Sequence, residues 1–122
     1  MKALIVDDSL TIRRIVRKAL AIVGINDAVD AEDGCAALEA INKTQDFDLI
    51  LLDWNMPKMS GIDALRTLRQ SGNKTPVIMV TTEAEKSRVI DAIKTGANDY
   101  LIKPFSPEQL AAKVKNVVAA PQ

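Results

Sequence analysis

Three short segments of the chain are apolar at every position, and they constrain the fold more than any other feature. They are residues 3–6 (ALIV), 49–52 (LILL) and 77–80 (VIMV). Unbroken apolar runs of this length favour strands that are buried on both faces of a parallel sheet. Residues 27–31 and 99–102 are weaker strand candidates that carry polar residues, so we expect them at or near the edges of that sheet.

Each candidate strand is followed by a segment in which apolar residues recur at helical spacing. In residues 12–23 they form a single stripe, and Gly24 marks its end. In the last segment Ser106 is a good N-cap and Pro107 suits the first helical turn. Besides residues 12–23, the helical patterns cover residues 37–41, 62–68, 89–93 and 110–118, the last of which follows Ser106 and Pro107.

Strand and helix therefore alternate five times in a chain of 122 residues, which is a usual size for one domain. This alternation favours an α/β fold, with helices on both faces of a parallel sheet and right-handed crossovers between strands. No linker or low-complexity tract interrupts the pattern. We expect residues 1–122 to form a single domain.

Charge and composition disfavour several classes of function. Lys plus Arg equals Asp plus Glu at 16 each, so nothing global points to nucleic acid or a membrane surface as a partner. No apolar run approaches the ~20 residues of a membrane helix, and none reads as a secretory signal, so we expect a cytoplasmic protein. With one Cys and no His, an internal disulfide, a Cys/His zinc site and histidine acid–base catalysis are excluded.

Polar side chains stand where the candidate strands end. In open α/β sheets, ligands bind outside the carboxyl ends of the strands, where the winding direction reverses. We therefore expect these side chains to converge in one pocket. In chain order they are Asp7, Asp8, Asp53, Thr81 and Lys103.

Three carboxylates in one pocket repel one another and need a neutralising partner. Two unit charges ~4 Å apart repel by roughly 4 kcal/mol at an effective dielectric of about 20. A raised pKa, the Lys103 ammonium or a divalent cation could relieve this repulsion, and Mg²⁺ commonly takes one or two carboxylates. Asp53 with Asp7 or Asp8 could bind such an ion. The Asn55 backbone carbonyl offers a further oxygen.

The same residues suit phosphoryl transfer, in which positioning and charge neutralisation do most of the catalysis. A carboxylate can attack phosphorus to form an aspartyl phosphate. Asp53 is the natural nucleophile, because the adjacent Asp7 and Asp8 are better placed as metal ligands. Lys103 would neutralise phosphoryl oxygens and the Thr81 hydroxyl would donate to one of them. As an alternative, Thr81 only caps the helix that follows it.

Five motifs occur in order along the chain: Val6-Asp7-Asp8; Asp53-Trp54-Asn55-Met56-Pro57 with Ser60-Gly61; Val80-Thr81; Gly96-Ala97 with Tyr100; and Lys103-Pro104-Phe105. Together they resemble the receiver domain of two-component response regulators, most closely its single-domain chemotaxis members. The resemblance covers the full length. It implies a flavodoxin-like (βα)5 three-layer sandwich with a parallel five-stranded sheet of order 2-1-3-4-5. It also implies that residues 1–122 are one receiver domain with no output domain.

The resemblance implies a phosphorylation site. Asp53 would be the phosphoacceptor, taking a phosphoryl group from a phosphohistidine of a sensor histidine kinase or phosphotransfer protein. Mg²⁺, with Mn²⁺ as a substitute, would bind the acids and the Asn55 carbonyl. Its acidic ligands would be Asp7, Asp8 and Asp53. Lys103 would contact the phosphate.

The resemblance also implies a switch. The Thr81 hydroxyl would move toward the phosphoryl group, and the Tyr100 ring would turn inward behind it. Asn55 and Glu83, two residues past Asp53 and Thr81, would tune the rate of dephosphorylation. An amide and an acid at these positions resemble the chemotaxis type and suggest a short-lived signal.

Three expectations concern the surroundings of the site. By resemblance, the Lys103–Pro104 peptide bond would be cis. Trp54 would be a partly exposed loop aromatic. Basic side chains that lie off the apolar stripe of residues 12–23 form either a solvated face or a docking surface for the phosphodonor protein. They are Arg13, Arg14, Arg17 and Lys18.

The leading interpretation is a phosphorylatable switch that catalyses only its own phosphoryl transfer and dephosphorylation. It would bind a protein target, such as a flagellar motor switch protein, through the face formed by residues 89–93, 99–102 and 110–118. A phosphatase is a further expected partner. We expect a monomer, with a dimer as the alternative for the phosphorylated form. A phosphorelay or developmental regulator would share these motifs.

Two other classes remain as rivals. A Mg²⁺-dependent phosphatase of the haloacid-dehalogenase type also forms an aspartyl phosphate, but it needs an acid where Asn55 stands, and a cap domain. A degenerate receiver that acts only as a binding scaffold is disfavoured by the intact set of polar residues at the strand ends.

Overall fold

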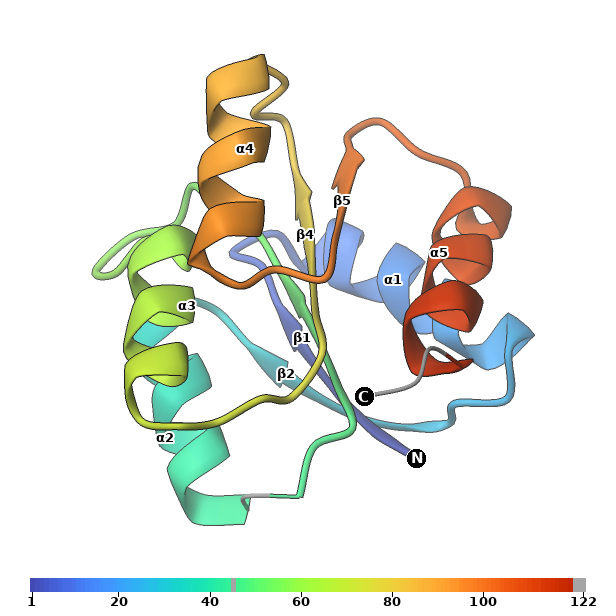
Figure 1. The fold of residues 1–122 in the computed structure, drawn as a ribbon. Coiled ribbons are helices and arrows are strands. Elements are labelled where there is room, and N and C mark those ends of the chain that lie inside the picture. The colour runs from blue at the N-terminus through green and yellow to red at the C-terminus, as the bar shows by residue number, and fades with distance from the viewer. Residues whose placement is uncertain (45, 120–122) are drawn as a thin grey trace.

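A computed structural model describes residues 1–44 and 46–119 of the chain. Five strands alternate with five helices (Figure 1). The strands are β1 (Lys2–Val6), β2 (Asp27–Ala31), β3 (Leu49–Leu52), β4 (Val77–Thr81) and β5 (Asp99–Ile102). The helices are α1 (Leu10–Ile22), α2 (Gly34–Thr44), α3 (Gly61–Gln70), α4 (Lys86–Thr95) and α5 (Pro107–Ala119).

The strands form one parallel sheet of order β2-β1-β3-β4-β5. α1 and α5 cover one face of this sheet, and α2, α3 and α4 cover the other (Figure 1). The predicted flavodoxin-like fold and strand order are therefore confirmed. The two weaker strand candidates are the edge strands β2 and β5, as their polar residues indicated.

The two cores explain why the central strands are apolar without interruption. Along β1, Leu4 and Val6 pack into the core beneath α2, α3 and α4, whereas Ala3 and Ile5 pack beneath α1 and α5. Successive side chains of a strand point to opposite faces, and here both faces are covered. The strands β3 and β4 divide their side chains in the same way. Polar groups can therefore gather only where these strands end.

Helix ends follow the local sequence. The hydroxyls of Ser9, Ser60 and Ser106 each accept a backbone N–H from the first turn of the next helix, at 3.1–3.3 Å. The N-cap of α4 is Glu85, so the alternative in which Thr81 caps that helix is wrong. Within the described part of the chain, no helix has the length and apolar character needed to cross a membrane.

Candidate phosphoacceptor site

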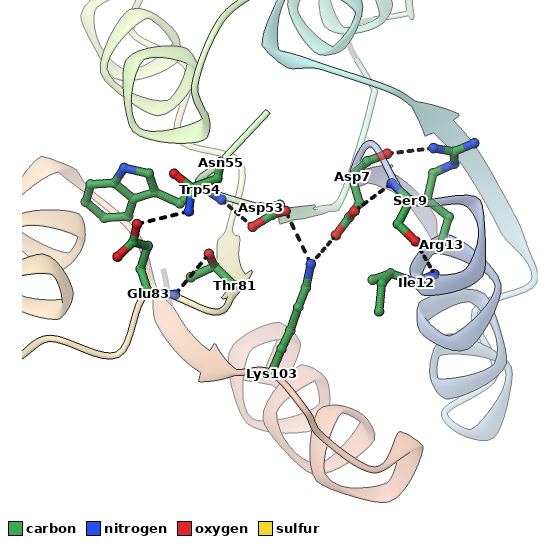
Figure 2. Close-up of polar contacts among 10 residues, drawn as sticks. All are labelled: Asp7, Ser9, Ile12, Arg13, Asp53, Trp54, Asn55, Thr81, Glu83 and Lys103. Carbon is green, nitrogen blue, oxygen red and sulfur yellow. Dashed lines mark hydrogen bonds and ion pairs between the residues drawn. The ribbon is translucent and has the colours of Figure 1, made fainter. Parts of the chain in front are cut away.

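The register of the strands brings the polar strand ends together. Val6 pairs with Leu52, and Thr81 pairs with Ile102. The residues that follow β1, β3 and β5 therefore reach the same edge of the sheet, beside the end of β4 (Figure 2). β1 and β3 are parallel neighbours at the centre of the order. From β1 the chain adds β2 on one side, and from β3 it adds β4 and β5 on the other. Open α/β sheets bind ligands at such a reversal.

Lys103 lies between two carboxylates at this edge (Figure 2). Its Nζ is 2.7 Å from Asp7 Oδ2 and 3.2 Å from Asp53 Oδ2. Asp7 and Asp53 are buried, while Asp8 is exposed. Each of the three acids offers a carboxylate oxygen, and these oxygens all lie within 4.8 Å of one another. The Lys103 ammonium therefore pairs with two of three clustered acids.

Burial makes this excess of negative charge costly. It raises the pKa of the Asp7 carboxyl, and the hydrogen bonds from Lys103 and the Ser9 N–H offset this effect only in part. Burial alone would lower the pKa of Lys103, but its hydrogen bond to Asp7 and the charge of Asp53 outweigh burial and raise it. Lys103 thus stays charged and still leaves the acids incompletely neutralised. A cluster of hard oxygen donors at this spacing fits a divalent cation such as Mg²⁺.

Backbone contacts hold Asp53 in place. Its N–H donates to the Val6 carbonyl at 3.0 Å, and its Oδ1 accepts the Trp54 N–H at 2.7 Å. The Gly61 N–H donates to the Trp54 carbonyl at 2.8 Å. A Cβ on Gly61 would lie only 1.8 Å from the Asp53 carbonyl oxygen. Glycine at this position therefore allows α3 to begin directly against the segment that carries Asp53.

Glu83 connects the other side of the site. Its carboxylate accepts the Asn55 Nδ2 at 2.9 Å, and its N–H lies 3.4 Å from the buried Thr81 Oγ1 (Figure 2). Its carbonyl accepts the Tyr100 hydroxyl at 2.6 Å. The Tyr100 ring is buried. Burial, together with the negative charge of Glu83, raises the pKa of Tyr100 to about 12.

The peptide bond between Lys103 and Pro104 is cis. The Lys103 N–H donates to the Thr81 carbonyl at 2.9 Å, which extends the pairing of β4 and β5 by one residue. Asp7, Asp8, Asp53, Asn55, Thr81, Glu83 and Lys103 thus lie at or just beyond the carboxyl ends of the strands, whereas Tyr100 lies within β5 and reaches Glu83 through its hydroxyl.

Two expectations about the surroundings are wrong. Trp54 is buried, because its ring packs in the core beneath α2, α3 and α4, and the Arg88 guanidinium lies 5.3 Å from the ring centre. Arg13 is also buried rather than solvated, and it donates to the Asp7 carbonyl and to Asp30. Its spacing contained a signal that was missed: Arg13 lies three residues before the buried Val16, on the same side of α1.

The other basic residues of α1 are exposed. Arg14 and Lys18 face solvent, and Arg17 pairs with Asp30 while remaining exposed. The predicted basic face is therefore reduced to these three side chains.

Comparisons with known proteins agree with this geometry. Residues 3–115 match the family model described as the response regulator receiver domain. The chain is 42% identical to the chemotaxis protein CheY1 of Helicobacter pylori over 97% of each protein. It is 43% identical to CheY-3 of Vibrio cholerae, over 96% of this chain and 91% of that protein.

Solved structures extend the comparison to the fold. The chemotaxis protein CheY4 of Vibrio cholerae superposes with a TM-score of 0.85 at 38% identity, covering 95% of this chain and 97% of that one. The receiver domain of Francisella response regulator 1452 superposes with a TM-score of 0.86 at 35% identity, covering 96% and 95%. The chain therefore belongs to the response regulator receiver domain family and is of the CheY type.

Proposed function

We propose that this receiver domain is a signalling switch that accepts a phosphoryl group on Asp53 in the presence of Mg²⁺. The observation that carries the proposal is the cluster of Asp7, Asp8 and Asp53 between β1 and β3, in which Lys103 pairs with Asp7 and Asp53. A pocket with this excess of negative charge gains from a cation. The phosphoryl group then finds the cation and Lys103 already in position.

In the proposed reaction, a carboxylate oxygen of Asp53 attacks the phosphorus of a phosphohistidine on a histidine kinase or phosphotransfer protein. The new O–P bond forms as the P–N bond breaks, and the electron pair leaves on the imidazole nitrogen of the donor. Lys103 neutralises a phosphoryl oxygen, and the Thr81 hydroxyl donates to another. Asp7, Asp8, Asp53 and the Asn55 carbonyl would hold Mg²⁺ or Mn²⁺, which when bound supplies further positive charge to the phosphoryl oxygens.

The signal is proposed to pass from Thr81 to Tyr100 through Glu83. A Thr81 hydroxyl that turns toward the phosphoryl group leaves the Glu83 N–H, while the Tyr100 hydroxyl holds the Glu83 carbonyl. Asn55 and Glu83 would also tune dephosphorylation, since their mutual hydrogen bond lies beside Asp53. The change would be read by a protein target through the face formed by α4, β5 and α5. Its exposed apolar side chains are Ile90, Ile93 and Ile102.

The names of the similar proteins favour a chemotaxis target, for which a flagellar motor switch protein is our proposal. A phosphorelay or developmental regulator would use the same site. The phosphatase of the haloacid-dehalogenase type is disfavoured, because Asn55 occupies the position of its required acid and donates to Glu83. The scaffold is disfavoured by the presence of the whole acid cluster.

Acetyl phosphate provides the test. The protein is incubated with acetyl phosphate and Mg²⁺, and its intact mass is measured alongside Asp53→Asn and the control Asp63→Asn, an exposed acid of α3. We expect one phosphoryl adduct in the wild type and in Asp63→Asn, and none in Asp53→Asn. An unmodified wild type would favour the scaffold, and sustained turnover of diverse phosphate esters would favour the phosphatase.

A second experiment addresses the partner. Beryllofluoride with Mg²⁺ imitates an aspartyl phosphate, so immobilised protein with and without it should capture different amounts of a purified motor switch protein. A target that carries the signal must distinguish the two states. Equal capture by both states would reject that target.

A further inference from the structure

The buried side chain of Arg13 links α1 and β2 to the acid cluster. Its Nη1 donates to the backbone carbonyl oxygen of Asp7 at 2.6 Å (Figure 2). Its Nε donates to Asp30 Oδ2 at 3.0 Å. Only 8% of Arg13 is exposed. The guanidinium is planar, so two bonds from different nitrogens fix its orientation.

The Asp7 carbonyl belongs to the peptide group that joins Asp7 to Asp8. On the other side of Asp7, its N–H donates to the Ala31 carbonyl at 3.1 Å, and its Oδ1 accepts the Ser9 N–H at 2.9 Å. Asp8 differs, because its side chain is exposed and takes part in no hydrogen bond with residues 1–44 or 46–119. The direction of the Asp8 carboxylate therefore depends on the peptide group that Arg13 holds.

Asp30 keeps Arg13 in place and balances its charge. It accepts Arg13 through Oδ2 and Arg17 through Oδ1. Arg17 also donates to the Ala28 carbonyl at 3.1 Å but has no bond to the segment of Asp7 and Asp8. The two arginines thus share one acid, and only Arg13 reaches the cluster.

We propose that Arg13, supported by Asp30, is a positioning residue that orients the Asp7–Asp8 peptide group and so preorganises the acid cluster for a divalent cation. The inference rests on the proposed function, since it concerns the same cluster. Removing a group that hydrogen-bonds to a metal ligand and fixes its orientation typically weakens metal affinity by about 10- to 100-fold. The Arg13 side chain contacts the backbone of Asp7, which is one of the proposed metal ligands, and Arg13 is not itself a ligand.

A purely electrostatic role predicts the opposite sign. If Arg13 acted only as a nearby positive charge, removing it would strengthen binding of a cation, because like charges repel. If it positions the peptide group, removing it weakens binding. The direction of the change in Mg²⁺ affinity therefore decides between the two roles.

Arg13→Met and Arg17→Met are a matched pair, because each removes one guanidinium from Asp30 and keeps an unbranched stem. Mg²⁺ binding is measured by calorimetry on both variants, and chemical denaturation without Mg²⁺ verifies that each is folded. We expect about a tenfold weaker Mg²⁺ affinity for Arg13→Met and less than about a twofold change for Arg17→Met. Unchanged or tighter binding by folded Arg13→Met would overturn the proposal.

A measurement without metal separates positioning from a general loss of stability. Hydrogen exchange of the Ser9 amide, which donates to Asp7, should be faster in Arg13→Met than in the wild type. Amides in the centre of β3 should keep their wild-type rates when the two proteins are compared under conditions that give them the same free energy of unfolding. Arg13→Lys retains a donor and should recover part of the Mg²⁺ affinity. Equal acceleration at Ser9 and in β3, or no recovery with Lys, would also contradict the proposal.

The outcomes remain distinct from a failure of the proposed function. If the wild type itself binds no Mg²⁺ in a manner that depends on Asp53, the proposed function fails. If the wild type binds Mg²⁺ and Arg13→Met binds it equally well, only the positioning role fails.

Discussion

Lys103 and Arg69 are cations at opposite ends of the same sheet, and their surroundings differ in charge. Lys103 lies at the carboxyl end of β5 between two carboxylates, with a third nearby. Arg69, near the end of α3, donates to neutral acceptors at the other end and to no acid of residues 1–44 or 46–119. Those acceptors are the Gly96 carbonyl at 2.9 and 3.1 Å, the Asn73 carbonyl at 3.0 Å and Asn98 Oδ1 at 3.2 Å.

The difference separates a cation that bonds to neutral carbonyls from one that lies beside surplus carboxylates. Arg69 satisfies the carbonyls of two loops, and burial lowers its pKa, with no acid in the described part of the chain paired to it to offset this effect. Its surroundings need no further charge. Lys103 has a raised pKa and still leaves surplus negative charge beside it. Such an excess of like charge costs stability, and the binding of a further cation would relieve it.

The largest expected effect on stability comes from substituting the glycine at each end of the sheet, Gly61 beside Asp53 and Gly96 beside Arg69. In Gly61→Ala the new Cβ would overlap the backbone oxygen of Asp53, which cannot move without shifting the site. In Gly96→Ala it would meet the flexible Arg69 side chain, at a residue with φ of 123°. We expect a loss of roughly 3–5 kcal/mol for Gly61→Ala and about 1–2 kcal/mol for Gly96→Ala, measured by urea denaturation. The reverse order would show that the acidic end is the more adaptable one.

Arg69→Met should produce the next largest effect. It leaves the Gly96 and Asn73 carbonyls without their donor, which costs about 2–3 kcal/mol of unfolding free energy. Mg²⁺ affinity should stay the same, because no bond of Arg69 reaches the acids. A change of more than about threefold in Mg²⁺ affinity would contradict the claim that Arg69 is independent of the acid cluster.

Lys103→Met should cost about as much, roughly 2–3 kcal/mol without Mg²⁺, because it leaves two buried carboxylates without their counter-charge, even though they can take up water or a proton. Mg²⁺ should restore this loss in Lys103→Met but not the loss in Arg69→Met, since only Lys103 shares its acids with the proposed ion. Denaturation of both variants with and without Mg²⁺ checks this. Equal restoration in both variants would contradict the comparison.

Titration of Tyr100 gives the smallest and most local effect. Its pKa is raised to about 12, so the folded state holds the phenolic proton more tightly than the unfolded state does. The contribution of Tyr100 to stability is then complete below its ordinary pKa of 10.0 and is lost as the pH rises toward 12. Tyr100 is the single tyrosine, so absorbance at the phenolate band follows it alone. Glu83→Gln should lower the midpoint, and a midpoint near 10 in the wild type would contradict the buried geometry.

Much of the fold could be predicted from the sequence because the patterns that mark strands and helices lie within short segments. Buried central strands must be apolar on both faces, so residues 3–6, 49–52 and 77–80 stood out without any partner information. Asp53 and Lys103 were then recognisable as polar groups at strand ends. The order of the strands came from family resemblance, since apolar runs alone carry no information on which strands are neighbours.

The two wrong expectations, that Arg13 and Trp54 are exposed, concern contacts between segments that are distant in the sequence. Arg13 is buried because Asp30, 17 residues away, and the Asp7 carbonyl both accept from it. No pattern within α1 reveals those partners. Trp54 is buried in the core beneath α2, α3 and α4, and the Arg88 guanidinium of α4 lies over its ring. The Arg69 side chain also donates to a distant acceptor, the Gly96 carbonyl 27 residues further along the chain, and the sequence carried no indication of that contact.

Stability with and without Mg²⁺ tests the central claim most directly, which is that the surplus acids form a cation site. The free energy of unfolding is measured in EDTA and in MgCl₂ at matched ionic strength, for the wild type and Asp53→Asn. At ten times its dissociation constant, a bound ion stabilises the folded state by about 1.4 kcal/mol. We predict that gain in the wild type and its absence in Asp53→Asn. No gain in the wild type, or an equal gain in both proteins, would contradict the account.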